Sequence, residues 1–285
     1  MSITLETGRS RLRRRQRASW SVVLCVTVII IVALLALLGE LIAPQDPDAQ
    51  MTSLGMSGPS AEHWLGTDQL GRDIFSRLIV GAQTAFVGPL VIAACSLVIG
   101  DLLGLVAGYF GGWVDSLIMR WVDLMWSIPS LLVIIVVAGA FGGGYWLAIG
   151  LLIVLVVPMD VRVVRGATLE QVPRPYVESA KTLGVSNIRI LVSHIWPNVA
   201  PVAVANSFLI FATALVSLSG LSFLGLGVNP GTPDWGLMLA ENLDLLFISP
   251  VAALAPGLMI VMNAGSMNVF GDWTYERLSE RGASR

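Results

Sequence analysis

Residues 176–197 read Tyr-Val-Glu-Ser-Ala-Lys-Thr-Leu-Gly-Val-Ser-Asn-Ile-Arg-Ile-Leu-Val-Ser-His-Ile-Trp-Pro, a polar, basic island between long hydrophobic segments. Pro175 suits the first position of a helix, because the N–H that proline lacks has no partner there anyway. Gly184 is placed to end that helix in a left-handed cap. Ser186 can then cap a second short helix over 187–194. The pattern predicts a water-exposed helix-turn-helix between two apolar segments.

The composition on either side of this island excludes an ordinary soluble domain. Hydrophobic residues make up 55% of the 285 residues, charged residues only 13%, and the mean hydropathy is +0.78, whereas soluble domains carry about 25% charged residues. A membrane-spanning helix needs about 20 apolar residues. The uncharged stretches predict an all-α membrane protein with six helices, at about 19–42, 80–107, 117–140, 145–161, 200–223 and 250–271. Five spans are the alternative, if the Gly-rich break at 141–144 is a kink and not a turn.

The positions of the basic residues orient these spans, since lysine and arginine collect on the cytoplasmic side. With six spans, only Arg72 and Arg77 fall outside, so fifteen of the seventeen basic residues lie on one face. Five spans would separate the downstream charges from the N-terminal arginines. Six spans with both termini in the cytoplasm are therefore favoured. The N-terminal arginines are Arg9, Arg11, Arg13, Arg14, Arg15 and Arg17.

The chain reads as one domain in consecutive parts. The apolar run near the N-terminus is longer than the core of a secretory signal and has no clear cleavage site after it, which favours an uncleaved anchor. The external segment ends in an amphipathic stretch, 73–79, that can lie at the membrane interface. Cys25 and Cys95 lie within spans and indicate neither a disulfide framework nor a metal site. The parts are a basic cytoplasmic N-terminus (1–18) that can touch anionic lipid, an anchor helix (19–43), an external segment (44–79), a core (80–271) with a cytoplasmic loop (162–198), and a cytoplasmic tail (272–285).

Several motifs together resemble one family. In the island, Glu178, Ala180, Gly184 and Pro197 have the spacing of the loop by which ABC importer permeases hold their ATPase. The remaining motifs are similar to the C-type permease subunit of dipeptide and oligopeptide ABC importers, and cover roughly residues 60–275. They are Gly66-Thr-Asp-Gln-Leu-Gly-Arg-Asp73 with Ser76-Arg77, Gly108-Tyr-Phe-Gly-Gly-Trp-Val-Asp115, Leu221-Ser-Phe-Leu-Gly-Leu-Gly227 and Gly271-Asp272.

The chain departs from the family pattern in places. Ser179 and Trp196 stand where the loop usually has Ala and Leu, Gln83 stands where a basic residue is frequent, and the Pro158-Met-Asp-Val161 segment replaces one that is commonly aromatic. These departures leave the docking geometry in place. They bear on the pore lining and on the choice of substrate.

The resemblance implies a type I ABC importer permease in a bacterial inner membrane. A homologous second permease would enclose the path with it, and an extracytoplasmic peptide-binding protein would deliver di- or oligopeptides from outside. Two ATPase subunits, which would carry ATP and magnesium, would dock on the loop. The loop residues implied in that contact are Tyr176, Glu178, Ser179, Ala180, Lys181, Gly184, His194 and Pro197.

The sequence contains no motif that indicates an enzyme. A nucleotide-binding loop ends in Gly-Lys-Ser/Thr, but the only lysine, Lys181, follows Ala180. The only histidines are His63 and His194, in different loops, so no histidine-based metal cluster is expected. No motif supports a nucleophile–base pair or indicates nucleic acid as a partner. ATP hydrolysis is therefore expected on another polypeptide, and no cofactor is expected on this one.

Two further groups of residues are candidates for function. The first is a set of polar outer-loop residues with one aromatic, which suit a transient contact with a binding protein; solvated loop charges are the alternative. These are Asp68, Arg72, Asp73, Asp234, Trp235 and Glu241. The second contains charged or hydroxyl residues inside spans, where charge is costly. Asp101 and Ser217 are candidates for the pathway or its gate; an inter-helix hydrogen bond or an interfacial position is the alternative for Asp101 and for Asp160.

Other functions remain open at this stage. The same fold could import nickel or another small solute. From a different class, an ATP-independent secondary transporter or channel would need no ATPase. A membrane anchor or sensor would leave uptake intact when the chain is lost.

Overall fold

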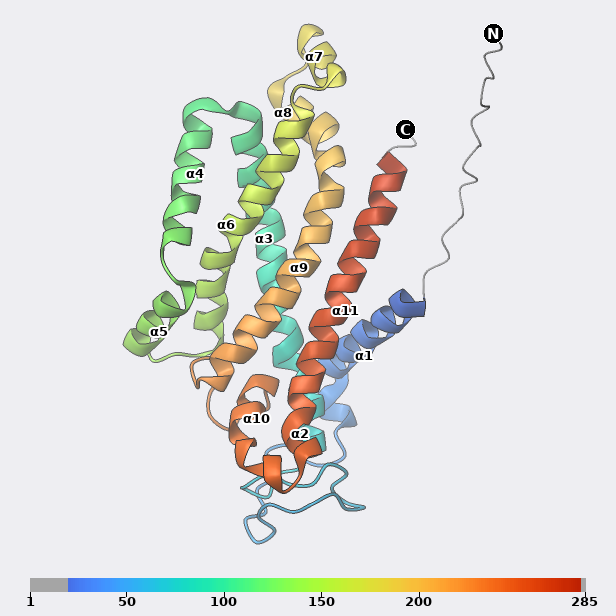
Figure 1. Ribbon diagram of the computed structural model, residues 1–285, viewed down its shortest axis with the longest axis vertical. Helices are drawn as coiled ribbons and strands as arrows, with labels where there is room; N and C mark the ends of the chain where they lie inside the picture. The colour runs from blue at the N-terminus through green and yellow to red at the C-terminus, as the bar shows by residue number, and fades with distance from the viewer. Residues whose placement is uncertain (1–19, 283–285) are drawn as a thin grey trace, which may run out of the picture.

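The computed structural model describes residues 20–282, and every regular element in that range is a helix. The arginine cluster of residues 1–18 lies outside the described residues. Five helices are long and apolar enough to cross a membrane; four of them run along the long axis of the molecule, and the first in the chain lies obliquely against them (Figure 1). They are α1 (Trp20–Ile42), α3 (Ala82–Phe110), α6 (Tyr145–Gln171), α9 (Trp196–Phe223) and α11 (Pro250–Gly282).

The expected span at 117–140 is not one straight helix. It is divided into α4 (Gly112–Ser127) and α5 (Ser130–Phe141), which meet at an angle of 78°. The cause is Pro129, because the residue before a proline is driven out of the helical region; Ile128 has the extended angles φ −107° and ψ 128°. If this bent pair crosses the membrane as one unit, it is the sixth span.

The glycine-rich break after α5 is a turn. Gly142, Gly143 and Gly144 all have positive φ, at 90°, 73° and 113°, a region that other residues rarely adopt. The helix therefore ends there, and α6 begins at Tyr145. The kink on which the five-span alternative rested is excluded.

Two helices continue beyond the apolar segments that predicted them. α6 reaches Gln171, not 161, and α11 reaches Gly282, not 271. Hydropathy detects only the part of a helix that suits lipid, so it misses turns that carry charged residues. The loop predicted at 162–198 thus begins as a helical extension of α6, and its first non-helical residue is Val172.

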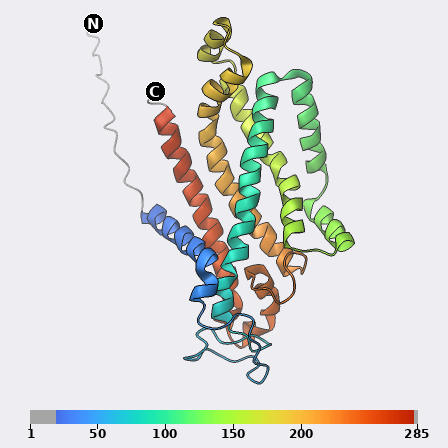
Figure 2. The ribbon, with the colours of Figure 1, turned by 180° about the vertical axis from the view of Figure 1, so that it is seen from behind.

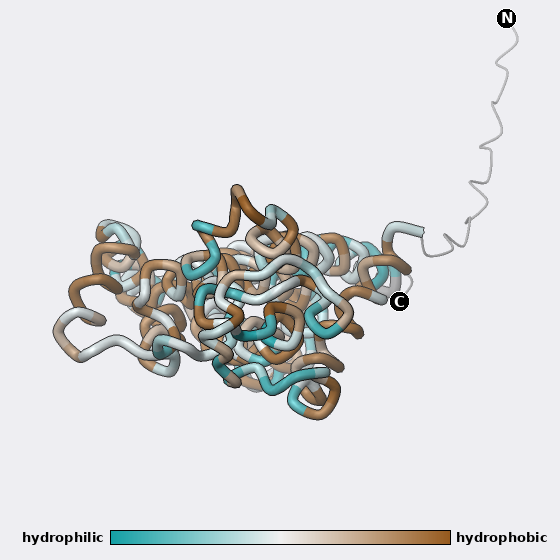
Figure 3. The backbone as a smooth tube through the Cα atoms, turned by 90° about the horizontal axis from the view of Figure 1, so that it is seen from below, coloured by the Kyte–Doolittle hydropathy of each residue, from teal (hydrophilic) through white to brown (hydrophobic). Residues whose placement is uncertain are grey.

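The short helices gather at the two ends of the bundle (Figure 1). We call the end with α7 and the last turns of α11 the loop end, and the opposite end, made of residues 44–81 and 224–249, the cap end. Seen from the cap end, hydrophilic residues lie along the loops nearest the viewer and hydrophobic ones along the surrounding helices (Figure 3). The short elements are α2 (Ile74–Val80), α7 (Pro175–Thr182), α8 (Asn187–Ile190), the π-helix η1 (Leu191–Ile195), α10 (Trp235–Glu241) and the 3₁₀-helix η2 (Leu243–Phe247).

A row of glycines lets α3 and α6 approach closely. Both helices run from the cap end to the loop end, side by side (Figure 2). A methyl group on Gly104 would lie 2.7 Å from Cβ of Val164, and one on Gly108 would lie 2.7 Å from Cβ of Thr168. Such distances are below any ordinary contact, so only glycine fits. Small residues one turn apart are the usual means of close helix packing in membranes.

The structure corrects the expectation for the stretch 73–79. Asp73 caps α2 by accepting a hydrogen bond from the Ser76 N–H at 2.7 Å. Six of the seven residues of the helix are buried, with Arg77 only 1% exposed. An interfacial helix would keep its polar face in water. This one is instead packed inside the cap end.

Accessible cysteines can test the predicted orientation. In a chain whose Cys25 and Cys95 are replaced by alanine, a cysteine at exposed Ser53 in the cap end should react with a membrane-impermeant maleimide in intact cells. A cysteine at exposed Ser186 in the loop end should react only after the cells are opened, because the positive-inside rule places this end in the cytoplasm. Labelling of Ser186→Cys but not of Ser53→Cys in intact cells would reverse the topology.

Candidate functional site: the loop between α6 and α9

The loop end of the molecule is built around α7. Pro175 occupies the first turn of this helix, and Glu178 follows in the same turn, as the sequence predicts. The chain turns away from the helix axis at Gly184, two residues after the last helical residue, where φ is +75°. The Gly184 N–H donates to the Lys181 carbonyl at 3.0 Å, and the Val185 N–H donates to the Ala180 carbonyl at 3.1 Å. These two bonds form a Schellman motif, so the predicted left-handed cap is confirmed.

One face of α7 is anchored and the other is free. Val177 and Ala180 are buried, at 0% and 5% exposure, in a cluster with residues at the start of α9. Glu178, Ser179 and Lys181 lie on the exposed face. The helix is thus held to the bundle by apolar contacts while its polar side chains project from the loop end. The buried partners of α7 in this cluster are Leu105, Val164, Ile190, Leu191, Ile195, Val199 and Ala203.

Hydrogen bonds secure the first turn of the loop. The Tyr176 hydroxyl donates to Oε1 of Gln171 at 3.0 Å and accepts from Nδ2 of Asn198 at 3.3 Å. Burial raises the pKa of Tyr176 above its usual value, so the hydroxyl keeps the proton that it donates to Gln171. This side chain therefore ties the end of α6 to the start of α9.

Lys181 contacts an aromatic ring and not a carboxylate. Among the described residues, no ion pair joins it to Glu178, one turn away. The Lys181 ammonium instead lies 5.3 Å from the ring centre of Tyr109, at the end of α3, a cation–π contact. The Tyr109 hydroxyl also donates to Oδ1 of Asn187 at 2.9 Å. The loop is thereby fixed to α3, and the Glu178 carboxylate is left exposed to solvent.

The second half of the loop is nearly continuous with α9. Asn187–Ile190 form α8, the π-helix η1 follows, and α9 begins at Trp196. Ser186 stands at the expected cap position but makes no side-chain capping bond. Pro197 lies in the first turn of α9, just after the wide π turn. His194 is exposed, with its ring beside the Arg189 carbonyl at 3.4 Å. The predicted helix-turn-helix exists, but its second helix merges with the span.

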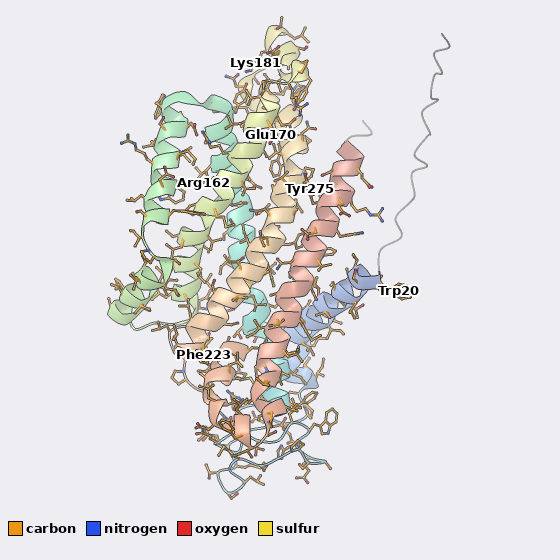
Figure 4. The ribbon with its side chains drawn as sticks, viewed as in Figure 1. Trp20, Arg162, Glu170, Lys181, Phe223 and Tyr275 are labelled. Carbon is orange, nitrogen blue, oxygen red and sulfur yellow. The ribbon has the colours of Figure 1, made fainter. Side chains whose placement is uncertain are left out.

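Two apolar side chains at the loop end are exposed, which the sequence did not predict. Leu183 is 81% exposed and Ile188 is 75% exposed. Both flank the Gly184 turn, outside the apolar stretches that predict spans. Lys181 in α7 lies at the far tip of the molecule and Glu170 lower on α6, which shows how far this region extends beyond the helices (Figure 4). These two side chains therefore leave apolar surface uncovered at the end of the molecule that carries α7.

The outer-loop candidates prove to be mostly buried. Exposure is at most 5% for Asp68, Arg72, Asp73, Asp234 and Trp235, and only Glu241 reaches the surface. Five of the six therefore cannot present side chains to a partner in this conformation, which removes the reason for choosing them. Contact between the surrounding outer loops and a binding protein stays a prediction.

These residues instead bind the two halves of the cap end together. Arg72 donates from Nε to Oδ2 of Asp68 at 2.6 Å and from Nη2 to Oε2 of Glu241 at 2.7 Å. Arg77 donates to the Gly231 carbonyl at 3.0 Å and lies 3.4 Å from Glu241. Trp235 donates from Nε1 to the Leu78 carbonyl at 2.8 Å. The network joins residues that are more than 150 positions apart.

The candidates inside the spans do not form one group. Asp101 and Asp160 are both buried, and Asp160 accepts a hydrogen bond from Asn206 of α9. Ser217 lies eleven residues beyond Asn206, or about 16 Å along the helix, and is half-buried. A role in the pathway or gate stays a prediction for Asp101 and Ser217. Within residues 20–282, no group of three or more His, Cys, Asp or Glu side chains could hold a metal ion.

Comparison with known proteins identifies the class. Residues 100–281, more than half of the chain, match the family described as "Binding-protein-dependent transport system inner membrane component". The chain belongs to this family. It is 38% identical, over 269 residues, to the glutathione transport system permease protein GsiD of Escherichia coli O6:K15:H31 (strain 536 / UPEC). The aligned region covers 94% of this chain and 88% of that protein. GsiD of Shigella dysenteriae serotype 1 (strain Sd197) is 37% identical with the same coverage.

The fold agrees with this assignment. A chain of the MetNI methionine ABC transporter, in an inward-facing conformation, superposes with a TM-score of 0.58 at 17% identity, covering 71% of this permease and 96% of that chain. A second crystal form gives 0.59. The predicted type I importer fold and the resemblance to peptide-type importer permeases are confirmed. The chain is therefore an inner-membrane transport permease, not an enzyme, of a class that works with a second permease, ATPase subunits and a binding protein.

The cap network predicts a large effect of one substitution. Arg77→Ala should lower the free energy of unfolding by about 3–5 kcal/mol, because it removes one partner of a buried charge network and leaves Glu241 and Asp68 with less compensation. Thermal unfolding of the purified permease in detergent measures this change. The control is Gln69→Ala, whose exposed hydrogen bond to Asp244 should contribute no more than about 0.5 kcal/mol. Equal stability of the two variants would contradict a structural role for Arg77.

Proposed function

We propose that this permease forms, with a homologous second permease, the path by which a bacterial ABC importer takes up small peptides. Two ATPase subunits dock on the loop of residues 176–197 and bind ATP and magnesium, while an extracytoplasmic binding protein delivers the peptide to the cap end. The observation that carries the proposal is the exposed tip of the loop. Its polar face and two apolar side chains project from a helix that is anchored to α3, α6 and α9.

Mechanical continuity supports a coupling role for the loop. α6 enters the loop at Gln171, η1 leads directly into α9, and the α7 cluster contains Val164 of α6 and Val199 of α9. Movement of a protein bound to the tip would therefore be transmitted to both helices as a rigid-body displacement, one of the usual means of switching a membrane transporter. A surface loop attached by a mobile linker would absorb such a movement.

The substrate class rests on a weaker argument. The relatives at 38% and 37% identity are named for glutathione transport, and glutathione is itself a small peptide. The sequence motifs are those of dipeptide and oligopeptide importers. We therefore assign di- or oligopeptides, with glutathione included among the candidates to be tested.

The Gly184 cap offers a sharp test of coupling. Nothing lies within 4 Å of a methyl group built at this position, but its φ is +75°. Gly184→Val should therefore strain the turn by about 1–3 kcal/mol through backbone conformation alone and displace the tip. Gly184→Asn is the matched control, because asparagine tolerates the left-handed region. The valine variant should insert normally, retain the partner permease in a pull-down, and lose ATPase binding or transport; the asparagine variant should keep both.

The exposed apolar side chains, Leu183 and Ile188, allow a second and independent test of the same proposal. Leu183→Ser should weaken retention of the ATPases without altering the turn. Leu54→Ser, at an exposed leucine of the cap end, should leave retention unchanged. If Gly184→Val and Leu183→Ser both transport normally with ATPases bound, the loop is not the coupling element.

The substrate is tested on the assembled importer. Its ATPase activity in proteoliposomes should rise when the binding protein is loaded with a dipeptide, an oligopeptide or glutathione, because a loaded binding protein favours one conformation of the permease pair. Nickel is the comparison ligand. Stimulation by nickel alone would replace the peptide assignment with a small-solute importer, and uptake by the permease without ATPases would indicate a secondary transporter or channel.

A further inference from the structure

Two carboxylates are buried where α3, α6 and α9 meet. Asp101 of α3 is 5% exposed and Asp160 of α6 is 1% exposed. The Asp160 side chain rests directly on the backbone of α3, since a methyl group at Gly100 would overlap with its carboxylate. Asn206 of α9 donates from Nδ2 to Oδ1 of Asp160 at 2.5 Å. The two acids therefore lie at the beginning of the glycine row that joins α3 to α6.

Several buried oxygens at this site lack a partner. Oδ1 of Asp101, Oδ2 of Asp160 and Oγ of Ser96 make no hydrogen bond. Ser96 is fully buried and lies one turn before Gly100 on α3. Asp101 directly follows Gly100, on which the Asp160 carboxylate rests, so the two acids come from adjacent positions of the same α3–α6 contact. Two ionised carboxylates with unpaired oxygens are among the most costly groups to bury.

Among residues 20–282, no ion pair joins a positive side chain to either carboxylate. The arginines of α6 that follow Asp160 point elsewhere: Arg162 pairs with Asp123 of α4 at 2.7 Å, and Arg165 pairs with Asp115 of α4 at 2.5 Å. Figure 4 shows Arg162 on α6, facing α4. α5 and α9 carry no ionisable residue. The remaining ionisable residues on the elements packed against α3 and α6 are Cys25 and Glu40 of α1, Arg77 of α2, Cys95 and Tyr109 of α3, Arg120 of α4, and Tyr145 and Glu170 of α6.

The geometry distinguishes between a metal ion and a proton as the missing positive charge. Calcium takes 6–8 oxygen ligands and magnesium six, whereas three unpartnered side-chain oxygens are present here. The contact of Asp160 with Gly100 also leaves no room for an ion on that side. A proton needs no cavity, and one proton removes one of the two charges. When two carboxylates share a site, the first proton is held by the pair as a unit.

We propose that Asp101 and Asp160 together hold one exchangeable proton between α3 and α6. The proton leaves the pair with one negative charge, and Asn206 stabilises that charge by its bond to Asp160. Separation of α3 from α6 would admit water and release this proton, so proton binding and close packing of the two helices support each other. Raising the pH should therefore weaken the packing, because the deprotonated pair carries two charges.

The test uses the full-length permease in detergent. Infrared spectroscopy near neutral pH should show the C=O stretch of a protonated carboxylic acid, and the melting temperature should fall as the pH is raised from mildly acidic to mildly basic. Asp101→Asn mimics the protonated member of the pair. It should lose the carboxylic acid band and the pH dependence of melting. Asp123→Asn, which replaces an exposed carboxylate of α4, should keep both.

Asp160→Asn provides a second variant, since asparagine can still accept the bond from Asn206. Loss of the band in both variants at the aspartate pair supports a shared proton. A band that survives in Asp160→Asn but not in Asp101→Asn would place the proton on Asp101 alone and overturn sharing. Absence of the band from the unmodified permease, or its persistence in both variants, would overturn the proposal. None of these measurements depends on transport, so they stand apart from the proposed function.

Discussion

The close approach of α3 to α6 is the constraint on which the other features of the permease depend. Glycines spaced one turn apart on α3 face Asp160, Val164 and Thr168 of α6, and a side chain at any of the three glycines would collide with its neighbour. In a membrane, water does not drive helices together, so dispersion contacts and polar bonds must hold them. Glycine at these three positions lets the two helices come closer together, which increases the dispersion contacts between them.

This contact also determines where the loop lies. Because α3 and α6 run in the same direction, both end at the loop end, and Tyr109 of α3 comes within reach of Lys181. Val164, in the middle of the glycine row, belongs to the same cluster as the buried face of α7. The packing inside the bundle and the position of the exposed tip are therefore one mechanical unit. A displacement at the tip has a direct route to the site of the buried carboxylates.

The cap end is held by a different kind of force. Its loops have little regular structure, and what joins them is a network of buried ions centred on Arg72, Arg77 and Glu241, with Trp235 bonded to the end of α2. Such networks add specificity of arrangement more than net stability. Long-range ion pairs, together with buried apolar side chains such as Trp235 and Met238, allow these irregular chain segments to take one definite shape.

The sequence by itself determined the features that depend on residues close together in the chain. Apolar length and charge defined the spans, and the conformational freedom of Gly184 defined the end of α7, because both act within a few residues of the chain. Part of the loop could therefore be placed correctly, including Pro175, Glu178 and the left-handed cap. The family resemblance came from the same local spacing.

Tertiary structure alone decided which side chains meet. Nothing in the sequence near Lys181 indicates that Tyr109 is its partner, and nothing near Arg72 indicates that Glu241 will bury it. The exposure of Leu183 and Ile188 likewise follows from how α7 is docked, and the pairing of Asp101 with Asp160 follows from the glycine row. Contacts between distant segments depend on the summed packing of all the helices, which no local pattern encodes.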